Sequence, residues 1–156
     1  MLSNKVLKIN HYKQTRGLSS CGSVSLKIVF EYYGKKLSEK ELIKRTKAFP
    51  GKGVSHKNMI KTARALGFKV SEKNKASIKD IKRFINENIP AIVNYINPRT
   101  KKGHYSVVRG YNNKSHIIIM ADSSNGDNFK ISEKDFLKAW HNSKNTSKKW
   151  MLIVKK

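Results

Sequence analysis

Cys21 is the only cysteine among the 156 residues, and it lies where a turn rich in Gly and Ser meets apolar residues with helical spacing. A thiol in the first turn of a helix lies near the positive end of the helix dipole and near unpaired backbone N–H groups. Both stabilise the thiolate, the nucleophilic form of cysteine. The position suits acyl transfer if the chain supplies a base. Alone, it equally suits a free cysteine that packs as a small apolar side chain.

A base and a group to orient it follow in the second half of the chain. His104 comes directly after Gly103 at the start of a predicted strand, and Asp122 directly follows the next strand. The start of one strand lies beside the end of its antiparallel neighbour, so we expect the carboxylate to fix the imidazole tautomer. Gln14 carries an amide that can face the same oxygen as the Cys21 backbone N–H. Each residue alone also suits an ordinary strand-end, turn or loop position, and only the combination indicates catalysis.

The elements that position these residues change character along the chain. Serines with helix-capping potential precede apolar runs of helical period, and alternating or continuous apolar runs then predict strands. The helices are expected to start near Ser20, Ser38, Ser55, Ser77 and Ser132, and the strands to cover Lys5–Ile9, Phe68–Val70, Ala91–Ile96, His104–Tyr111, Ser115–Ala121 and Trp150–Val154, with a polar loop at Asp122–Asp127. Helices followed by strands predict an α+β fold with an antiparallel sheet, in one domain over residues 1–156.

Charge is the most unusual bulk property of the chain. There are 34 Lys and Arg residues against 10 Asp and Glu, which gives a net charge of +24. Such a charge attracts acidic peptides, nucleic acid or anionic lipid. The lysines are spread along nearly every element, without an Arg-rich tract or an interleaved aromatic and basic signature, so a solvated lysine surface is favoured over dedicated nucleic-acid binding.

Composition also narrows the chemistry and the compartment. A single cysteine excludes an internal disulfide and Cys-rich metal clusters, and the five histidines show no tight metal-binding spacing, so we expect no metal and no cofactor. No apolar run is long enough to span a bilayer. The first ten residues lack the apolar segment of a secretory signal, which predicts a cytoplasmic chain unless a leader has been removed.

Motifs that cover most of the chain resemble one family, the bacteriocin-processing cysteine peptidases. The matching segments are Gln14–Gly22, Tyr32–Gly34, Gly53–Ser55, Leu66–Gly67, the strand after Pro90, Gly103–Gly110 and Ala121–Asp122. These peptidases are papain-like domains, often found at the front of peptide-exporting ABC transporters, that cut after a double-glycine leader. The resemblance implies a papain-like fold, with an N-terminal helical half packed on a C-terminal antiparallel sheet.

The resemblance also implies a role for each candidate residue. Cys21 would be the nucleophile, His104 the general base and Asp122 the carboxylate that orients it. Gln14 would donate to the oxyanion together with the Cys21 amide. The substrate would be a peptide or protein, of acidic character given the charge of the chain.

Three serines depart from the family pattern. Ser20 and Ser23 occupy positions where relatives commonly have an acidic residue and an alanine, and Ser123 follows Asp122 where relatives often have proline. Ser20 cannot supply the charge of a carboxylate, whereas the change at Ser123 is expected to matter little for the chemistry. No transporter segments follow, which fits a stand-alone peptidase or a relative with another substrate.

Several functions remain open at the level of sequence. The same four residues suit peptide hydrolysis, including cleavage after small residues such as Gly-Gly, and they equally suit deamidation, transpeptidation or isopeptide hydrolysis. These reactions share the acyl-enzyme half-reaction. A catalytically idle peptide-binding domain is the alternative from another class, and the presence of Gln14, Cys21, His104 and Asp122 together speaks against it.

Overall fold

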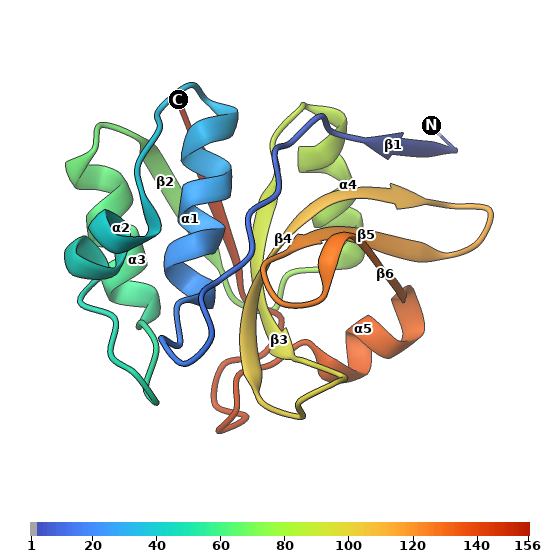
Figure 1. The fold of residues 1–156 in the computed structure, drawn as a ribbon. Coiled ribbons are helices and arrows are strands. Elements are labelled where there is room, and N and C mark those ends of the chain that lie inside the picture. The colour runs from blue at the N-terminus through green and yellow to red at the C-terminus, as the bar shows by residue number, and fades with distance from the viewer. Residues whose placement is uncertain (1–2) are drawn as a thin grey trace.

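The computed structural model describes residues 3–156, and Figure 1 shows its helices and strands. The helices are α1 (Cys21–Tyr32), α2 (Glu39–Thr46), α3 (His56–Ala65), α4 (Ile78–Asn86) and α5 (Glu133–Ala139); the strands are β1 (Asn4–Val6), β2 (Lys69–Lys73), β3 (Ala91–Ile96), β4 (Gly103–Asn112), β5 (Ile117–Asp122), β6 (Gly126–Ser132) and β7 (Met151–Lys155). Helices α1 to α3 gather on one side of the molecule and β3 to β6 lie on the other (Figure 1). The expected α+β fold, with a helical half against an antiparallel sheet, is confirmed.

A single antiparallel sheet runs through both halves in the order β2-β7-β3-β4-β5-β6. Strand β4 is the longest, and β1 joins the same edge of β4 that β3 occupies. Ala91 of β3 pairs with Val108, and Val6 of β1 pairs with Gly110 a little further along. Strands β2 and β7 lie beside the helices in Figure 1, so the sheet connects the helical half to the other strands.

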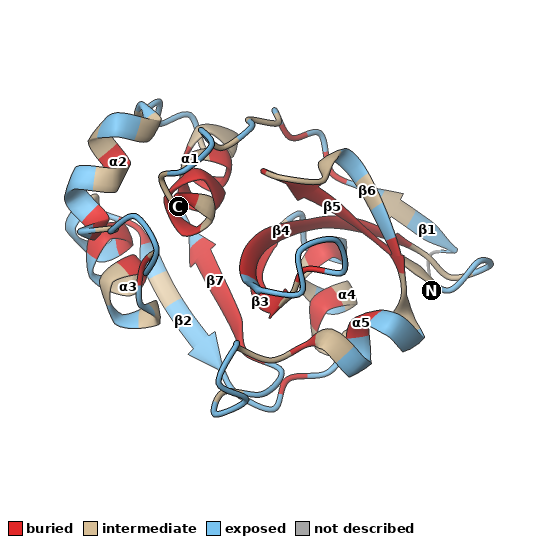
Figure 2. Cartoon of the chain, turned by 60° about the horizontal axis from the view of Figure 1, so that its bottom comes forward, coloured by how far each residue is buried: buried red, intermediate tan, exposed pale blue. Residues whose placement is uncertain are grey.

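The core lies between α1 and the middle of the sheet. Figure 2 shows buried residues concentrated in α1, β3, β4, β5 and β7, whereas few residues of β1, β2 and β6 are buried. Helix α1 is apolar around most of its circumference because α2 and α3 cover one side and β4 the other. Val24, Leu26 and Phe30 are fully buried there, and Phe30 stacks on Phe68. This packing holds the first residue of α1 against the sheet.

Four of the five helices in residues 3–156 begin with the serine cap that the sequence predicts. The hydroxyls of Ser38, Ser55, Ser77 and Ser132 each accept a hydrogen bond from the backbone N–H three residues later. Such a cap stabilises a helix by about 1 kcal/mol. Ser20 occupies the same position before α1 but its side chain caps nothing, so its hydroxyl is available for another contact.

The structure corrects several expected boundaries. Residues Gly126–Ser132 form strand β6, which extends into the region expected to be a loop. Its apolar alternation is weak because β6 is an edge strand in which only Ile131 is buried. The strand expected over Lys5–Ile9 ends at Val6, and Asp122 is the last residue of β5 rather than the first of a loop. Within residues 3–156, no helix has both the length and the apolar character needed to cross a membrane.

Candidate active site

Cys21 is the first residue of α1 and remains partly exposed. The backbone N–H of Tyr105, on β4, lies 3.4 Å from its Sγ atom. Gly22 allows this close packing, since a Cβ at that position would lie 2.2 Å from Cγ1 of Val54 and 3.1 Å from the Tyr105 ring. The Tyr105 hydroxyl donates to the Val54 carbonyl at 3.0 Å, which fixes the ring beside the helix start. The nucleophile candidate therefore lies at the contact between helix and sheet.

His104 and Asp122 lie side by side, from the start of β4 and the end of β5. His104 Nε2 donates to Asp122 Oδ1 at 2.9 Å, and both side chains are buried. Burial by itself would lower the pKa of His104, but hydrogen bonds with Asp122 and Cys21 outweigh it and raise the pKa to about 10. With Nε2 directed at the carboxylate, Nδ1 is the ring nitrogen available to the thiol. A protonated imidazole is one half of a thiolate–imidazolium pair.

Four donors hold the carboxylate of Asp122. Besides His104, the backbone N–H groups of Ser124 and Asn125 donate to Oδ1 at 2.9 and 2.8 Å, and the Tyr95 hydroxyl donates to Oδ2 at 2.9 Å. Burial would raise the pKa of Asp122, but the hydrogen bond and the charge of His104 hold it well below its usual range. The carboxylate is thus ionised and rigidly aimed, as a group that orients a base must be.

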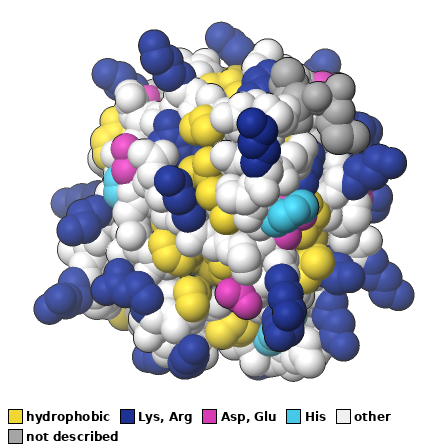
Figure 3. Space-filling model, turned by 90° about the vertical axis from the view of Figure 1, so that its right-hand side faces the viewer, with side chains coloured by type: hydrophobic (Ala, Val, Ile, Leu, Met, Phe, Trp, Pro, Cys, Tyr) yellow, Lys and Arg dark blue, Asp and Glu magenta, His cyan; other side chains and the backbone are white. Residues whose placement is uncertain are grey.

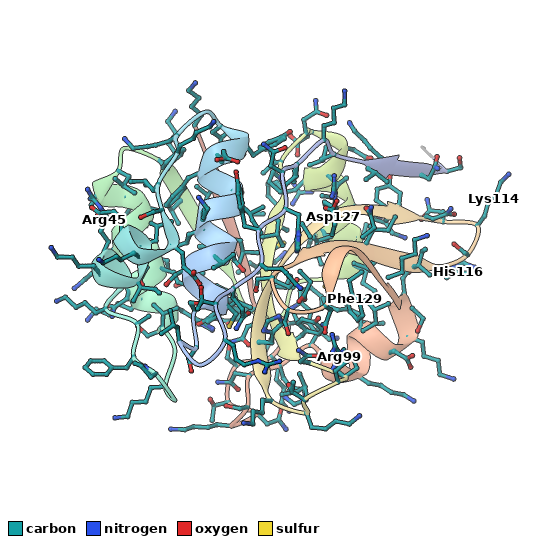
Figure 4. The ribbon with its side chains drawn as sticks, viewed as in Figure 1. Arg45, Arg99, Lys114, His116, Asp127 and Phe129 are labelled. Carbon is teal, nitrogen blue, oxygen red and sulfur yellow. The ribbon has the colours of Figure 1, made fainter. Side chains whose placement is uncertain are left out.

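The residues that support this carboxylate are not among those predicted from the sequence. Tyr95 pairs with His104 across β3 and β4. The register of that hairpin is therefore the signal that could have indicated Tyr95. Asn125 Nδ2 donates to the Tyr95 hydroxyl at 3.3 Å, and Arg99 Nη1 donates to Asn125 Oδ1 at 3.3 Å. Figure 4 labels Arg99 in the lower part of the view, below β5. Loop contacts of this kind leave no periodic pattern in a sequence.

Gln14 is tied to the residue that follows Asp122. Its backbone N–H donates to the Ser123 carbonyl at 2.9 Å, and its Oε1 accepts from the Ser123 hydroxyl at 2.7 Å. The second bond fixes which way the amide is turned, and it leaves Nε2 as the donor that can face a substrate. Ser123 therefore has a structural role that a proline could not fill, because proline has no hydroxyl to hold the amide. That the change matters little for the chemistry stays a prediction.

The turn before Cys21 is held by side chains. Ser19 adopts a left-handed backbone conformation, with φ of 51°, and its hydroxyl accepts from the Gly51 N–H at 2.8 Å. The Ser20 hydroxyl donates to Glu39 Oε2 at 2.6 Å. A carboxylate is therefore present at this point after all, supplied by the first residue of α2 rather than by residue 20.

Basic side chains cover much of the surface, with few acidic ones between them, as Figure 3 shows for one face. A pocket of about 610 Å³ opens beside α3, where the His56 ring stacks on Trp150 at 3.8 Å and meets Tyr105 edge-on at 5.6 Å. Tyr105 links this pocket to Cys21. The other lining side chains are Lys57, Ile60, Lys61, Arg64, Glu72, Asn74, Thr146 and Ser147.

The comparisons with known proteins agree on one class of fold. The model of the family described as Peptidase_C39 like matches residues 6–148. The peptidase domain of Streptococcus ComA, a bifunctional ABC transporter involved in a quorum-sensing pathway, superposes with a TM-score of 0.74 at 20% identity, covering 93% of this chain and 96% of that one. A double-glycine motif protease from an AMS/PCAT transporter, solved with its leader peptide, gives 0.69 at 22% identity, covering 96% and 93%.

A C39-like protein of Bacillus anthracis gives a TM-score of 0.74 at 15% identity, covering 97% of this chain and 98% of that one. No match was found among curated proteins. At these identities the solved structures establish the fold, which is the one expected from the sequence.

Proposed function

Because the chain belongs to the Peptidase_C39 like family, we propose that it is a cysteine peptidase with Cys21 as its nucleophile. His104 is the general base, Asp122 orients and stabilises it, and Gln14 is the side-chain donor to the oxyanion. The observation that carries the proposal is the buried His104–Asp122 pair at 2.9 Å, next to Tyr105, whose backbone N–H lies 3.4 Å from Cys21 Sγ. Reactive cysteines require such a base beside the thiol.

The reaction follows from these positions. His104 holds the proton of the Cys21 thiol, and the thiolate attacks the carbonyl carbon of the scissile bond. The carbonyl oxygen becomes negatively charged and accepts hydrogen bonds from Gln14 Nε2 and the Cys21 backbone N–H. His104 then donates its proton to the leaving amine, and the C–N bond breaks to leave a thioester.

Water completes the cycle. His104 accepts a proton from a water molecule that attacks the thioester carbon, and the same two donors hold the second oxyanion. The carboxylic acid product leaves, and the thiolate and imidazolium are restored. Asp122 remains ionised throughout, and its role is to keep Nε2–H fixed so that Nδ1 faces the reacting atoms.

The substrate we propose is a peptide with small residues before the scissile bond. A structural relative with the same fold is a double-glycine motif protease solved with a leader peptide, which supports a Gly-Gly-like cleavage site here. The net charge of +24 and the basic rim of the pocket beside α3 favour an acidic peptide through long-range attraction. We propose that residues 1–156 work as one domain, since strands beside the helices and strands beside the base share one sheet.

The test is hydrolysis of a peptide that ends in Gly-Gly joined to a fluorescent amine, with Cys21→Ala as the first variant. We expect hydrolysis to disappear while the melting temperature stays within a few degrees of wild type, because Cys21 is only partly buried. Hydrolysis that survives Cys21→Ala would contradict the proposal. Mass spectrometry of products from a peptide library would separate hydrolysis from deamidation or transpeptidation and give the residues around the cleaved bond.

A further inference from the structure

Glu39, the first residue of α2, binds the turn that connects Gln14 to Cys21. Its Oε2 accepts from the Thr15 backbone N–H at 2.9 Å and from the Ser20 hydroxyl at 2.6 Å, and its Oε1 accepts from the Thr15 hydroxyl at 2.5 Å. Both carboxylate oxygens are therefore engaged by the turn. Hydrogen bonds to a charged acceptor are stronger than neutral ones, so this carboxylate is a firm attachment point.

The two residues that Glu39 holds adjoin the two proposed oxyanion donors. The Thr15 nitrogen belongs to the peptide bond that follows Gln14, and Ser20 directly precedes Cys21. The peptide bond before Gln14 is fixed from the other half of the molecule, where its N–H donates to Ser123. Gln14 is thus held between sheet and helices, with Glu39 as the attachment on the helical side.

Packing alone does not hold this turn. Residues 15 to 17 are exposed, so they bury little apolar surface. Ser19 is in the left-handed region at φ 51°, a conformation that costs a non-glycine residue on the order of 1 kcal/mol or more. Ser20 is fully buried but does not cap α1, because its hydroxyl is directed at Glu39. Side-chain hydrogen bonds therefore determine where the turn lies.

We propose that Glu39 is a positioning residue for the oxyanion site: its carboxylate sets the spacing between Gln14 Nε2 and the Cys21 N–H so that both reach one carbonyl oxygen. The inference rests on the proposed function. Burial by itself would raise the pKa of Glu39, but hydrogen bonds from Ser20 and Thr15 outweigh it and lower the pKa. The group is therefore ionised at neutral pH and accepts from all three donors.

The role predicts a split between two reactions of the same thiol. Peptide hydrolysis and hemithioacetal formation with a peptide aldehyde both create an oxyanion, whereas alkylation by iodoacetamide displaces iodide at a saturated carbon and creates none. In Glu39→Ala we expect kcat to fall about tenfold with KM within twofold, a smaller loss than removal of a whole oxyanion donor gives. Aldehyde affinity should weaken by a similar factor, and the alkylation rate of Cys21 should stay within twofold.

Glu41→Ala is the matched control. Glu41 lies in the same first turn of α2, where its negative charge also interacts favourably with the helix dipole, but its carboxylate binds Arg45 at 2.8 Å on the surface. It should leave hydrolysis, aldehyde affinity and alkylation unchanged. Glu39→Gln retains one acceptor oxygen, so it should give an intermediate loss of kcat and of aldehyde affinity. It also provides a second test if Glu39→Ala folds poorly.

Two results would overturn the role of Glu39. One is unchanged hydrolysis and aldehyde affinity in both Glu39 variants. The other is an equal loss of hydrolysis and alkylation, which would mean that Glu39 supports the thiolate or the fold in general. Cys21→Ala measured alongside keeps the two proposals apart: hydrolysis that persists there contradicts the peptidase itself, whereas hydrolysis that needs Cys21 but ignores Glu39 contradicts only the positioning role.

Discussion

The two sides of the candidate site are built in different ways. On the sheet side, His104 and Asp122 come from the ends of adjacent strands, and four donors from strands and the following loop hold the carboxylate. On the helical side, an irregular turn leads from Gln14 to Cys21, and a few side-chain contacts hold it. Regular backbone pairing thus positions the proposed base, whereas individual side chains position the proposed oxyanion donors.

This difference predicts different tolerance to substitution. Losing one support on the sheet side leaves others in place, so its effect on turnover should be small unless the carboxylate itself changes. Losing one side chain on the helical side leaves fewer alternatives, so its effect on turnover should be larger than its effect on stability. Substitutions on both sides test that ordering, from the largest expected effect on turnover to the smallest.

Among substitutions on the sheet side, Asp122→Asn should reduce turnover the most. Asn keeps the size of the side chain and an oxygen for the N–H groups of Ser124 and Asn125, but it removes the charge that stabilises the His104 imidazolium. We expect turnover to fall by about 100-fold, with a smaller change in the free energy of unfolding. Steady-state kinetics and thermal melts on one preparation check this. A large loss of melting temperature with normal turnover of the folded fraction would mean that Asp122 is structural.

The titration of His104 should be displaced by several pH units. Although burial opposes the charge, hydrogen bonds with Asp122 and Cys21 raise the pKa from its ordinary 6.5 to about 10. The raised pKa means that the ring keeps its proton as the pH rises past 6.5 and loses it only near pH 10. Nitrogen chemical shifts of the imidazole between pH 5 and 11 measure this, and the midpoint should fall in Asp122→Asn. A midpoint near pH 6.5 in wild type would contradict the stabilisation of the protonated His104 ring by Asp122 and Cys21.

Ser123→Ala tests how the turn before α1 is held at Gln14, by a contact from the residue that follows β5. The hydroxyl that fixes the amide is lost, while the backbone bond from the Gln14 N–H to the Ser123 carbonyl is kept. We expect kcat to fall roughly fivefold as the amide samples other orientations, a share of the loss that a missing oxyanion donor causes. Alkylation of Cys21 by iodoacetamide should be unchanged. Wild-type kcat in this variant would show that Ser123 does not orient Gln14.

Tyr95→Phe should have the smallest effect on turnover. It removes the donor to Asp122 Oδ2 and leaves the three donors to Oδ1. The buried oxygen left without a donor should lower the free energy of unfolding by about 2 kcal/mol. Turnover should change only about twofold, because His104 stays in place. If Tyr95→Phe lowers kcat more than Ser123→Ala does, the contrast between the two sides is wrong.

The sequence predicts the sheet side better than the helical side, because regular strand pairing leaves a periodic pattern in the sequence and individual side-chain contacts do not. Strand period and hairpin connection make His104 and Asp122 neighbours. The helical period of the apolar residues after Gly22 indicates α1, although Ser20 does not cap it. Glu39 reaches the turn across 19 residues to Ser20 and 24 to Thr15, and no periodic pattern encodes such a contact. Strand β6 is not predicted from the sequence for a related reason, since an edge strand with few buried side chains shows little apolar alternation.

Ser20 and Ser123 depart from the family pattern, and the consequence of each departure becomes clear only from the contacts in the structure. From the sequence, the first lacks a charge and the second is neutral to the chemistry. In the structure, Ser20 donates to the carboxylate of Glu39, and Ser123 donates to the amide of Gln14. The carboxylate that residue 20 lacks is thus supplied by Glu39, from another helix.

The most direct test of the account is the rate at which iodoacetamide alkylates Cys21 at pH 6. A free cysteine is only about 0.3% thiolate at that pH, so it reacts slowly. If His104 and Cys21 form a thiolate–imidazolium pair, wild type should be alkylated rapidly and selectively at pH 6, and His104→Ala should slow the reaction at least tenfold. A wild-type rate equal to that of a free thiol, unchanged by His104→Ala, would contradict the account.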